Sequence, residues 1–336
     1  MNEDARAFAD ALNVTTIPVH LAQCTYRNYS NARYNEKQVC AAPYPDFKLS
    51  WGRYALIHGW LAACHSCDGP VLLTDFRDVF FQRSPFDGLT IDGLQVFEEH
   101  PRLRTTNWLV DWPVQACTGL RLDKPMLCSG TTVGTRKAML KYLRRMVHAF
   151  KAWGSKPSCR FATVGDDQSI HNYLYYTGEL PFAHAVPHRT GIVNTVGYEG
   201  AQIYRRHVAE HGGHNNASGL PYDGATSPRW IGMNSGLIDR QGFLTDIDNA
   251  TRSRVVHQYD RLGPPFLKWL RGFTGEKGSR VKREKLREEP VGDKGELRHA
   301  HGKHDDAPGP TDPVPLVKRE KLQRLGRLRP QPQQQS

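Results

Sequence analysis

Apolar residues along the first 275 positions recur in runs with helical spacing and in short strand-like runs, the pattern of an α/β domain. Residues 49–64 place Tyr54, Ile57 and Leu61 at helical spacing, and Ser50 is positioned to cap this segment. We therefore expect a helix over residues 49–64.

The strand expected after this helix ends in two carboxylates. Val71–Leu73 is an apolar run, Asp75 and Asp78 follow it, and a second apolar run ends before Pro85. Buried strands that deliver acidic groups to a sheet edge have this form. Neighbouring carboxylates repel each other unless a cation lies between them, and a divalent cation that also holds a diphosphate is one candidate. An ordinary strand-to-turn junction is the alternative, because Asp is common in turns.

Arg53 is expected in the first turn of the 49–64 helix. The helix dipole disfavours a cation at that end, so the placement indicates an anionic partner. An exposed surface arginine is the alternative.

A small-residue kink, Ser129-Gly130-Thr131, is expected to interrupt the apolar strand within residues 125–136. Glycine there lets a ligand approach the backbone closely, and a strand bulge is the alternative. A helix is expected to follow over about residues 137–149.

Residues 165–174 have the features of a helix start. Asp166 or Asp167 can cap it, and Ile170 and Leu174 have the spacing of packed neighbours. Capping explains one aspartate but not the Asp-Gln pair that follows.

An apolar pair, Val255 and Val256, precedes His257. An imidazole at a strand end suits a metal ligand, and a hydrogen-bonded structural histidine is the alternative. Asp260 and Arg261 are expected to form a local ion pair.

Taken in this order, the motifs resemble those of nucleotide-diphospho-sugar glycosyltransferases with the GT-A fold, of the D-x-D type found in the galactosyl and glucosyl transferase branch. The resemblance implies an α/β fold with a GT-A-like mixed sheet and flanking helices. It also implies a metal cofactor, Mn²⁺ or Mg²⁺, bound by Asp75, Asp78 and His257. In the D-x-D register the second Asp falls on Arg77. Either a turn brings Asp78 to the metal, or Arg77 neutralises part of the diphosphate charge.

The same resemblance assigns the remaining site residues. The donor would contact Arg53, Asp75, Arg77, Ser129 and Gly130. The catalytic pair would be Asp167, which contacts sugar hydroxyls or acts on the acceptor, and Gln168, which lies near the anomeric carbon.

The function implied is transfer of a sugar from a nucleotide-sugar donor, a UDP-sugar, to a hydroxyl acceptor on a glycan, protein or lipid. One alternative is a non-catalytic nucleotide- or sugar-binding relative with the same fold. A strand-end-Asp phosphohydrolase is less favoured, because Asp75-Phe-Arg-Asp78 lacks the spacing and the threonine of that motif.

Composition divides the chain into two parts. Residues 276–336 contain no aromatic residue, 15 Lys or Arg and 10 Asp or Glu, so we expect a disordered basic tail there and one glycosyltransferase-like domain over residues 1–275. The whole chain carries a net charge of +11. A basic domain suits a nucleotide diphosphate substrate, and no pattern typical of nucleic-acid binding accompanies the charge.

Seven cysteines allow several arrangements. Cys24 with Cys40, or Cys117 with Cys128, are candidate disulfides in an oxidising lumen. Cys64-His-Ser-Cys67 is a lone C-x-x-C motif, for which buried or locally paired thiols are favoured over a zinc site.

The N-terminal region is expected to open with a helix over residues 5–12 and a strand over residues 15–21, so a GT-A-like fold would lack its first strand. We see neither a transmembrane run nor a signal peptide. The expected location is the Golgi or secretory lumen if an upstream anchor is missing from this chain, and otherwise the cytoplasm.

Overall fold

A computed structural model describes residues 14–23, 39–41, 44, 47, 49–76, 78–159, 166–210, 237–239 and 243–263. The chain divides into two units, Met1–Val281 and Lys282–Ser336, and every described residue belongs to the first. The helix expected at 5–12 and the tail expected from residue 276 lie outside the described residues. Within the described ranges, no helix is long and apolar enough to cross a membrane.

The described part is an α/β structure with mixed sheets. The larger sheet has the order β3-β6-β5-β7, in which β6 runs antiparallel to both neighbours and β5 pairs with β7 in parallel. Its strands are β3 (Pro70–Thr74), β5 (Leu94–Glu98), β6 (Leu127–Thr135) and β7 (Ala183–Val186).

A second sheet has the order β4-β9-β8. Its strand β9 pairs antiparallel with β4 and parallel with β8. These strands are β4 (Val79–Phe81), β8 (Val193–Thr195) and β9 (Val255–His257). A separate antiparallel pair is formed by β1 (Leu21–Gln23) and β2 (Val39–Ala41).

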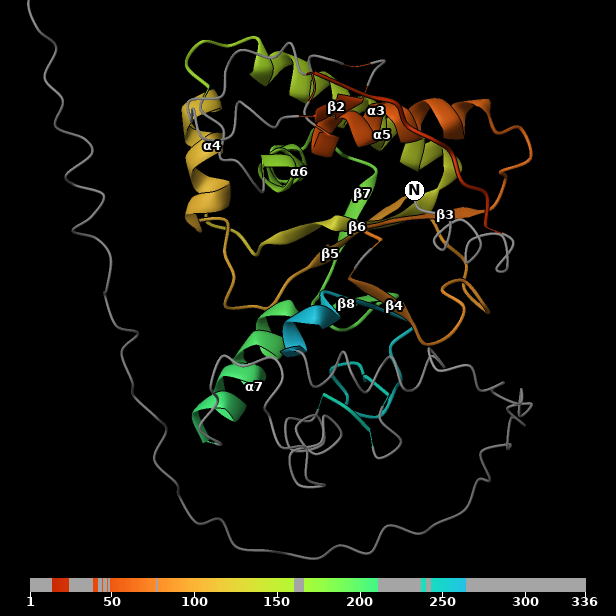
Figure 1. The fold of residues 1–336 in the computed structure, drawn as a ribbon, viewed down its shortest axis with the longest axis vertical. Coiled ribbons are helices and arrows are strands. Elements are labelled where there is room, and N and C mark those ends of the chain that lie inside the picture. Colours follow the sequence, from red (N-terminus) through yellow and green to blue (C-terminus); the bar gives the residue numbers. More distant parts are fainter. Residues whose placement is uncertain are drawn as a thin grey trace, which may run out of the picture. The chain divides into compact units, whose positions relative to one another are not determined.

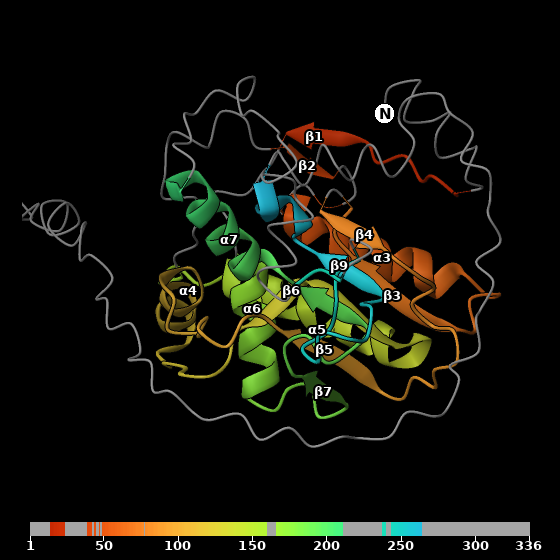
Figure 2. The same ribbon diagram turned by 90° about the horizontal axis from the view of Figure 1, so that it is seen from below.

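Helices cover one face of the larger sheet and the β4-β9-β8 sheet lies on the other side (Figure 1, Figure 2). The flanking helices are α3 (Leu49–Ala63), α4 (Trp108–Thr118), α5 (Arg136–Gly154) and α6 (Asp166–Tyr176). The chain continues from β8 into α7 (Gly197–Glu210), and a short 3₁₀ helix, η2 (Tyr259–Leu262), follows β9.

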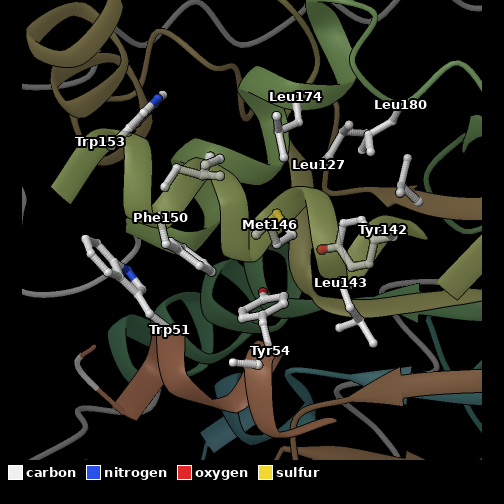
Figure 3. Packing of buried hydrophobic residues seen from close by; sticks show 14 of the residues in the cluster. Trp51, Tyr54, Leu127, Tyr142, Leu143, Met146, Phe150, Trp153, Leu174 and Leu180 are labelled. Atoms are coloured by element: carbon white, nitrogen blue, oxygen red, sulfur yellow. The ribbon is translucent and has the colours of Figure 1, made fainter. Parts of the chain in front are cut away.

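The main core lies between α3 and α5. Trp51 of α3 stacks on Phe150 of α5 with ring centroids 4.9 Å apart, and Tyr54 packs against the same ring (Figure 3). The buried residues of α5 recur every three or four positions, among them Tyr142 and Met146. This amphipathic pattern holds α5 on the sheet, because each buried large side chain contributes about 1.5–3 kcal/mol.

Several local expectations need correction. Helix α3 begins at Leu49, so Ser50 lies inside the helix rather than at its cap, and Arg53 falls beyond the first turn. The strand expected at residues 15–21 is confined to β1, because pairing with β2 involves only Leu21–Gln23. Strand β6 is continuous through Ser129, Gly130 and Thr131, although its register against β5 shifts between Val96 and Glu98, opposite this segment.

The disulfides also differ from one expectation. Cys117 pairs with Cys159, not with Cys128. Cys117, near the end of α4, and Cys159, in the segment after α5, lie 4.4 Å apart between their Cα atoms, whereas Cys128 of β6 is a buried free thiol. Local pairing in the C-x-x-C motif is confirmed by the Cys64–Cys67 disulfide. Cys40 is disulfide-bonded, and Cys24 lies outside the described residues.

Candidate metal centre and active site

Asp75, Asp78 and His257 come together, with a ligand atom of each within 4.8 Å of the others. Asp75 follows β3, Asp78 precedes β4, and His257 ends β9. The ladder between β4 and β9 places Val79 opposite His257, and the Gln258 amide donates to the Asp78 carbonyl at 2.7 Å. His257 Nε2 therefore lies 3.9 Å from Asp75 Oδ2 and 3.7 Å from Asp78 Oδ1.

The His257 ring is buried, and its Nε2 has no hydrogen-bond partner among the described residues. On the other side of the ring, Nδ1 lies 3.3 Å from Cys128 Sγ and 3.4 Å from Thr195 Oγ1. A proton on Nδ1, held by either group, leaves the Nε2 lone pair facing the two carboxylates. Burial lowers the pKa of His257, which favours the neutral imidazole that binds metals.

The carboxylates are crowded together. Burial raises the pKa of Asp78, and the neighbouring Asp75 and Asp260 raise it further against the opposing effect of His257. A divalent cation relieves repulsion of this kind. Two carboxylate oxygens and an imidazole nitrogen form a donor set that suits such an ion.

Gly130 of β6 leaves the space in which these groups meet. A Cβ at this position would lie 2.7 Å from Asp75 Oδ2 and 2.9 Å from His257 Nε2, closer than nonbonded atoms approach. The Gly130 carbonyl also accepts a 2.8 Å hydrogen bond from the Asp75 amide, which fixes the start of the acidic loop. The orphaned imidazole nitrogen and this open cradle together fit a bound ion.

Arg53 joins two of the expected site residues. Its guanidinium pairs with Asp75 Oδ1 and, at 2.7 Å, with Asp167 Oδ2. Burial by itself would lower the pKa of Arg53, but Tyr54, Asp167 and Asp75 outweigh burial and raise it. Arg53 therefore stays charged and leaves Asp75 Oδ2 turned toward His257.

Asp167 lies in a polar corner at the start of α6. Besides Arg53, its Oδ2 atom accepts longer contacts from Ser129 Oγ and Tyr54 Oη, both at 3.4 Å. The expected donor residue Ser129 thus lies beside the expected catalytic residue Asp167. Arg77, also expected to contact the donor, lies outside the described residues.

Gln168 faces a different set of groups. Its amide donates to Glu99 Oε1 at 2.7 Å and to the Leu127 carbonyl at 3.1 Å. Burial raises the pKa of Glu99, opposed first by Gln168 and then by the Cys128 thiol, which itself contacts His257. The structure therefore connects Gln168 to the cluster through buried side chains, and Gln168 does not line the cleft described next.

A cleft of about 650 Å³ opens in front of the carboxylates. Asp75, Phe76, Asp78, Asp260 and Arg261 line it. The expected ion pair of Asp260 and Arg261 is confirmed, with Arg261 Nε 3.6 Å from Asp260 Oδ1. The Arg261 side chain is 58% exposed, so this cation remains available to an anionic ligand in the cleft.

Sequence reasoning missed Glu99 and Tyr54 as neighbours of the site, and it did not place Arg261 in the cleft. The Glu98-Glu99 pair at the end of a strand was a detectable signal of the same kind as Asp75 and Asp78. Tyr54 gave no such signal, because its helical spacing identified it only as a core residue. Comparison with family models, curated proteins and solved structures finds no match to this chain.

Proposed function

We propose that this protein is a metal-dependent glycosyltransferase with a GT-A-like fold, which transfers a sugar from a UDP-sugar to a hydroxyl group of a glycan, protein or lipid. The observation that carries the proposal is the cluster of Asp75, Asp78 and His257 around the Gly130 cradle, at the mouth of a cleft that also contains Arg261. Binding a diphosphate with its metal ion requires carboxylates that coordinate the cation and an arginine that pairs with the phosphates.

Each residue of the site would have a distinct role. Asp75 Oδ2, Asp78 and His257 Nε2 would hold Mn²⁺, or alternatively Mg²⁺. When bound, the ion would stabilise the negative charge that develops on the leaving diphosphate. Arg261 would face the same phosphates, because it lines the same cleft. Arg53 would keep Asp75 in the orientation that presents Oδ2.

Asp167 and Gln168 have different parts in this proposal. Asp167 borders the cluster through Arg53 and Ser129, so it would contact the sugar or the acceptor. Gln168 would act indirectly, by positioning Glu99 and the start of β6.

Two disulfides in the described part favour an oxidising compartment, so we place the activity in the secretory lumen.

The non-catalytic alternative keeps the same metal centre without turnover. The phosphohydrolase alternative requires Asp75 as a nucleophile. Its Oδ1 atom is paired with Arg53, which makes that role unfavourable.

Release of free UDP from UDP-sugars by the full chain, with Mn²⁺, Mg²⁺ or EDTA, tests the proposal. A screen of nucleotide-sugars by thermal shift selects the donor first. Metal-dependent UDP release supports a transferase. Metal-dependent stabilisation without release supports the binding relative, and phosphate release from p-nitrophenyl phosphate supports the hydrolase. Wild-type protein that neither binds Mn²⁺ nor releases UDP would overturn the proposal.

A further inference from the structure

Phe76 is the most exposed large hydrophobic residue in the described part of the chain. Its side chain is 90% exposed, whereas the next, Trp108, is 64% exposed. Phe76 stands between the two carboxylates of the candidate metal centre and lines the same cleft. Singly exposed apolar side chains are common, but this one lines the cleft beside the metal cluster, where a bound ligand would remove its apolar surface from water.

The ring projects from a loop whose ends are fixed. On one side the Asp75 amide donates to the Gly130 carbonyl at 2.8 Å, and Arg53 holds the Asp75 side chain. On the other side the Asp78 carbonyl accepts from the Gln258 amide at 2.7 Å. Phe76 is therefore presented at a defined place beside the metal cluster, which a binding surface requires.

The chemistry of the cleft separates the parts of a ligand. Asp75 and Asp78 can bind a metal ion and Arg261 can bind phosphate groups, whereas a phenyl ring can bind neither. The ring offers a flat π face, which stacks on planar aromatic rings. A ligand that satisfies both halves of the cleft carries phosphates at one end and a planar ring at the other.

We propose that Phe76 is the stacking platform for the nucleobase of a nucleoside diphosphate whose phosphates face the Asp75–Asp78–His257 cluster. This inference rests on the proposed metal centre and goes beyond it, because it assigns the residue that distinguishes a nucleotide from a simple diphosphate. Stacking depends little on the identity of the base, so UDP and ADP should gain from Phe76 to a similar extent.

The test compares two ligands that share their phosphates. Isothermal titration calorimetry with Mn²⁺ measures Kd for UDP and for inorganic pyrophosphate with the wild-type chain and with Phe76→Leu and Phe76→Trp. We expect Phe76→Leu to weaken UDP binding by about tenfold or more and to leave pyrophosphate within about twofold. Phe76→Trp should retain UDP binding, because it keeps an aromatic face. Phe81→Leu is the matched control, since Phe81 is half exposed on β4 but does not line the cleft.

Each other outcome has a definite reading. Equal weakening of UDP and pyrophosphate by Phe76→Leu would assign Phe76 to the shape of the metal loop and overturn the stacking role. Unchanged UDP binding would also overturn it. If the wild-type protein binds Mn²⁺ and pyrophosphate but Phe76→Leu does not change UDP binding, the stacking proposal fails while the metal centre stands. The two proposals can therefore fail separately.

Discussion

Asp75 Oδ2 and His257 Nε2 lie 3.9 Å apart, although one residue follows β3 and the other ends β9, in a different sheet. Any side chain at position 130 of β6 would place its Cβ against these two atoms, and glycine has no Cβ. This relationship depends on three strands at once, and it supplies the most direct tests of the metal centre.

Gly130→Ala should weaken metal binding while the protein stays folded. The added Cβ would lie 2.7 Å from Asp75 Oδ2, so either the carboxylate or the imidazole must turn away. We expect Mn²⁺ affinity to fall by about tenfold or more, by analogy with the loss caused by misplaced ligands in other metal sites. Calorimetric titration with Mn²⁺ measures it. Gly59→Ala is the control, because nothing lies within 4 Å of its added Cβ. That substitution in α3 should stabilise the fold by about 0.5–1 kcal/mol and leave Mn²⁺ binding unchanged.

Asp75→Asn should abolish Mn²⁺-stimulated UDP release, because it removes one negative charge and one ligand oxygen from the cluster. The expected fall in turnover is about 100-fold or more, as for the loss of other groups that stabilise developing charge. Steady-state UDP release with saturating Mn²⁺ measures it. Asp68→Asn changes an exposed aspartate ahead of the same strand and should behave as wild type. Near wild-type stimulation in Asp75→Asn would show that the acidic loop does not bind the metal.

Arg53→Gln should destabilise the fold, because Asp75 and Asp167 lose the cation between them. We expect a decrease of about 2 kcal/mol in the free energy of unfolding, from the loss of two charged hydrogen bonds. Arg53→Lys should recover only part of it, since an ammonium group cannot bridge two carboxylates as a guanidinium does. Urea denaturation measures both variants. The surface pair of Arg104 and Asp123 provides a comparison, and Arg104→Gln should cost less than about 1 kcal/mol.

Acid should destabilise the protein partly through His171. Burial lowers the pKa of this fully buried imidazole to about 4, only partly opposed by Asp167. The unfolded state, with an ordinary pKa near 6.5, binds the proton first, so stability is lost as pH falls from about 6.5 toward 4. The loss attributable to His171 is about 3 kcal/mol when the interval has been crossed.

His171→Gln tests this dependence. Urea titrations at about pH 7 and about pH 4.5 give the free energy of unfolding at each pH. The decrease between these pH values should be smaller in His171→Gln than in the wild type, by most of the roughly 3 kcal/mol attributed to His171. The variant loses the hydrogen bond between Tyr142 Oη and His171 Nδ1, which lowers stability at both pH values and so does not affect the difference. His148→Gln, at an exposed position of α5, should keep the wild-type difference. An unchanged pH dependence in His171→Gln would contradict the assignment.

The Cys117–Cys159 disulfide should contribute strongly to stability. It closes a loop with a sequence separation of 42, for which the chain-entropy estimate is about 4 kcal/mol. The double variant Cys117→Ala with Cys159→Ala should therefore have a lower Tm than the wild type in the absence of reductant. Dithiothreitol should narrow the difference between the two proteins. A Tm of the double variant equal to that of the oxidised wild type would show that the disulfide adds no stability.

The sequence was sufficient for the local elements of the site. Helical spacing predicted α3, and apolar runs predicted β3 and the strand that ends in His257, because such patterns depend on residues a few positions apart. The small residues of β6 and the paired aspartates of α6 were recognised for the same reason. The order of these motifs along the chain then suggested that they belong to one nucleotide-sugar site.

Tertiary structure alone decided how these elements meet. The pairing of Cys117 with Cys159 depends on how the ends of α4 and α5 pack, and no spacing along the chain encodes it. The engagement of Gln168 with Glu99 depends on the approach of α6 to β5 and β6. The sequence by itself determined which side chains carry charge and on which element each one lies. The fold determined which of them share a site, because contacts between residues distant in the chain arise only when sheets and helices pack together.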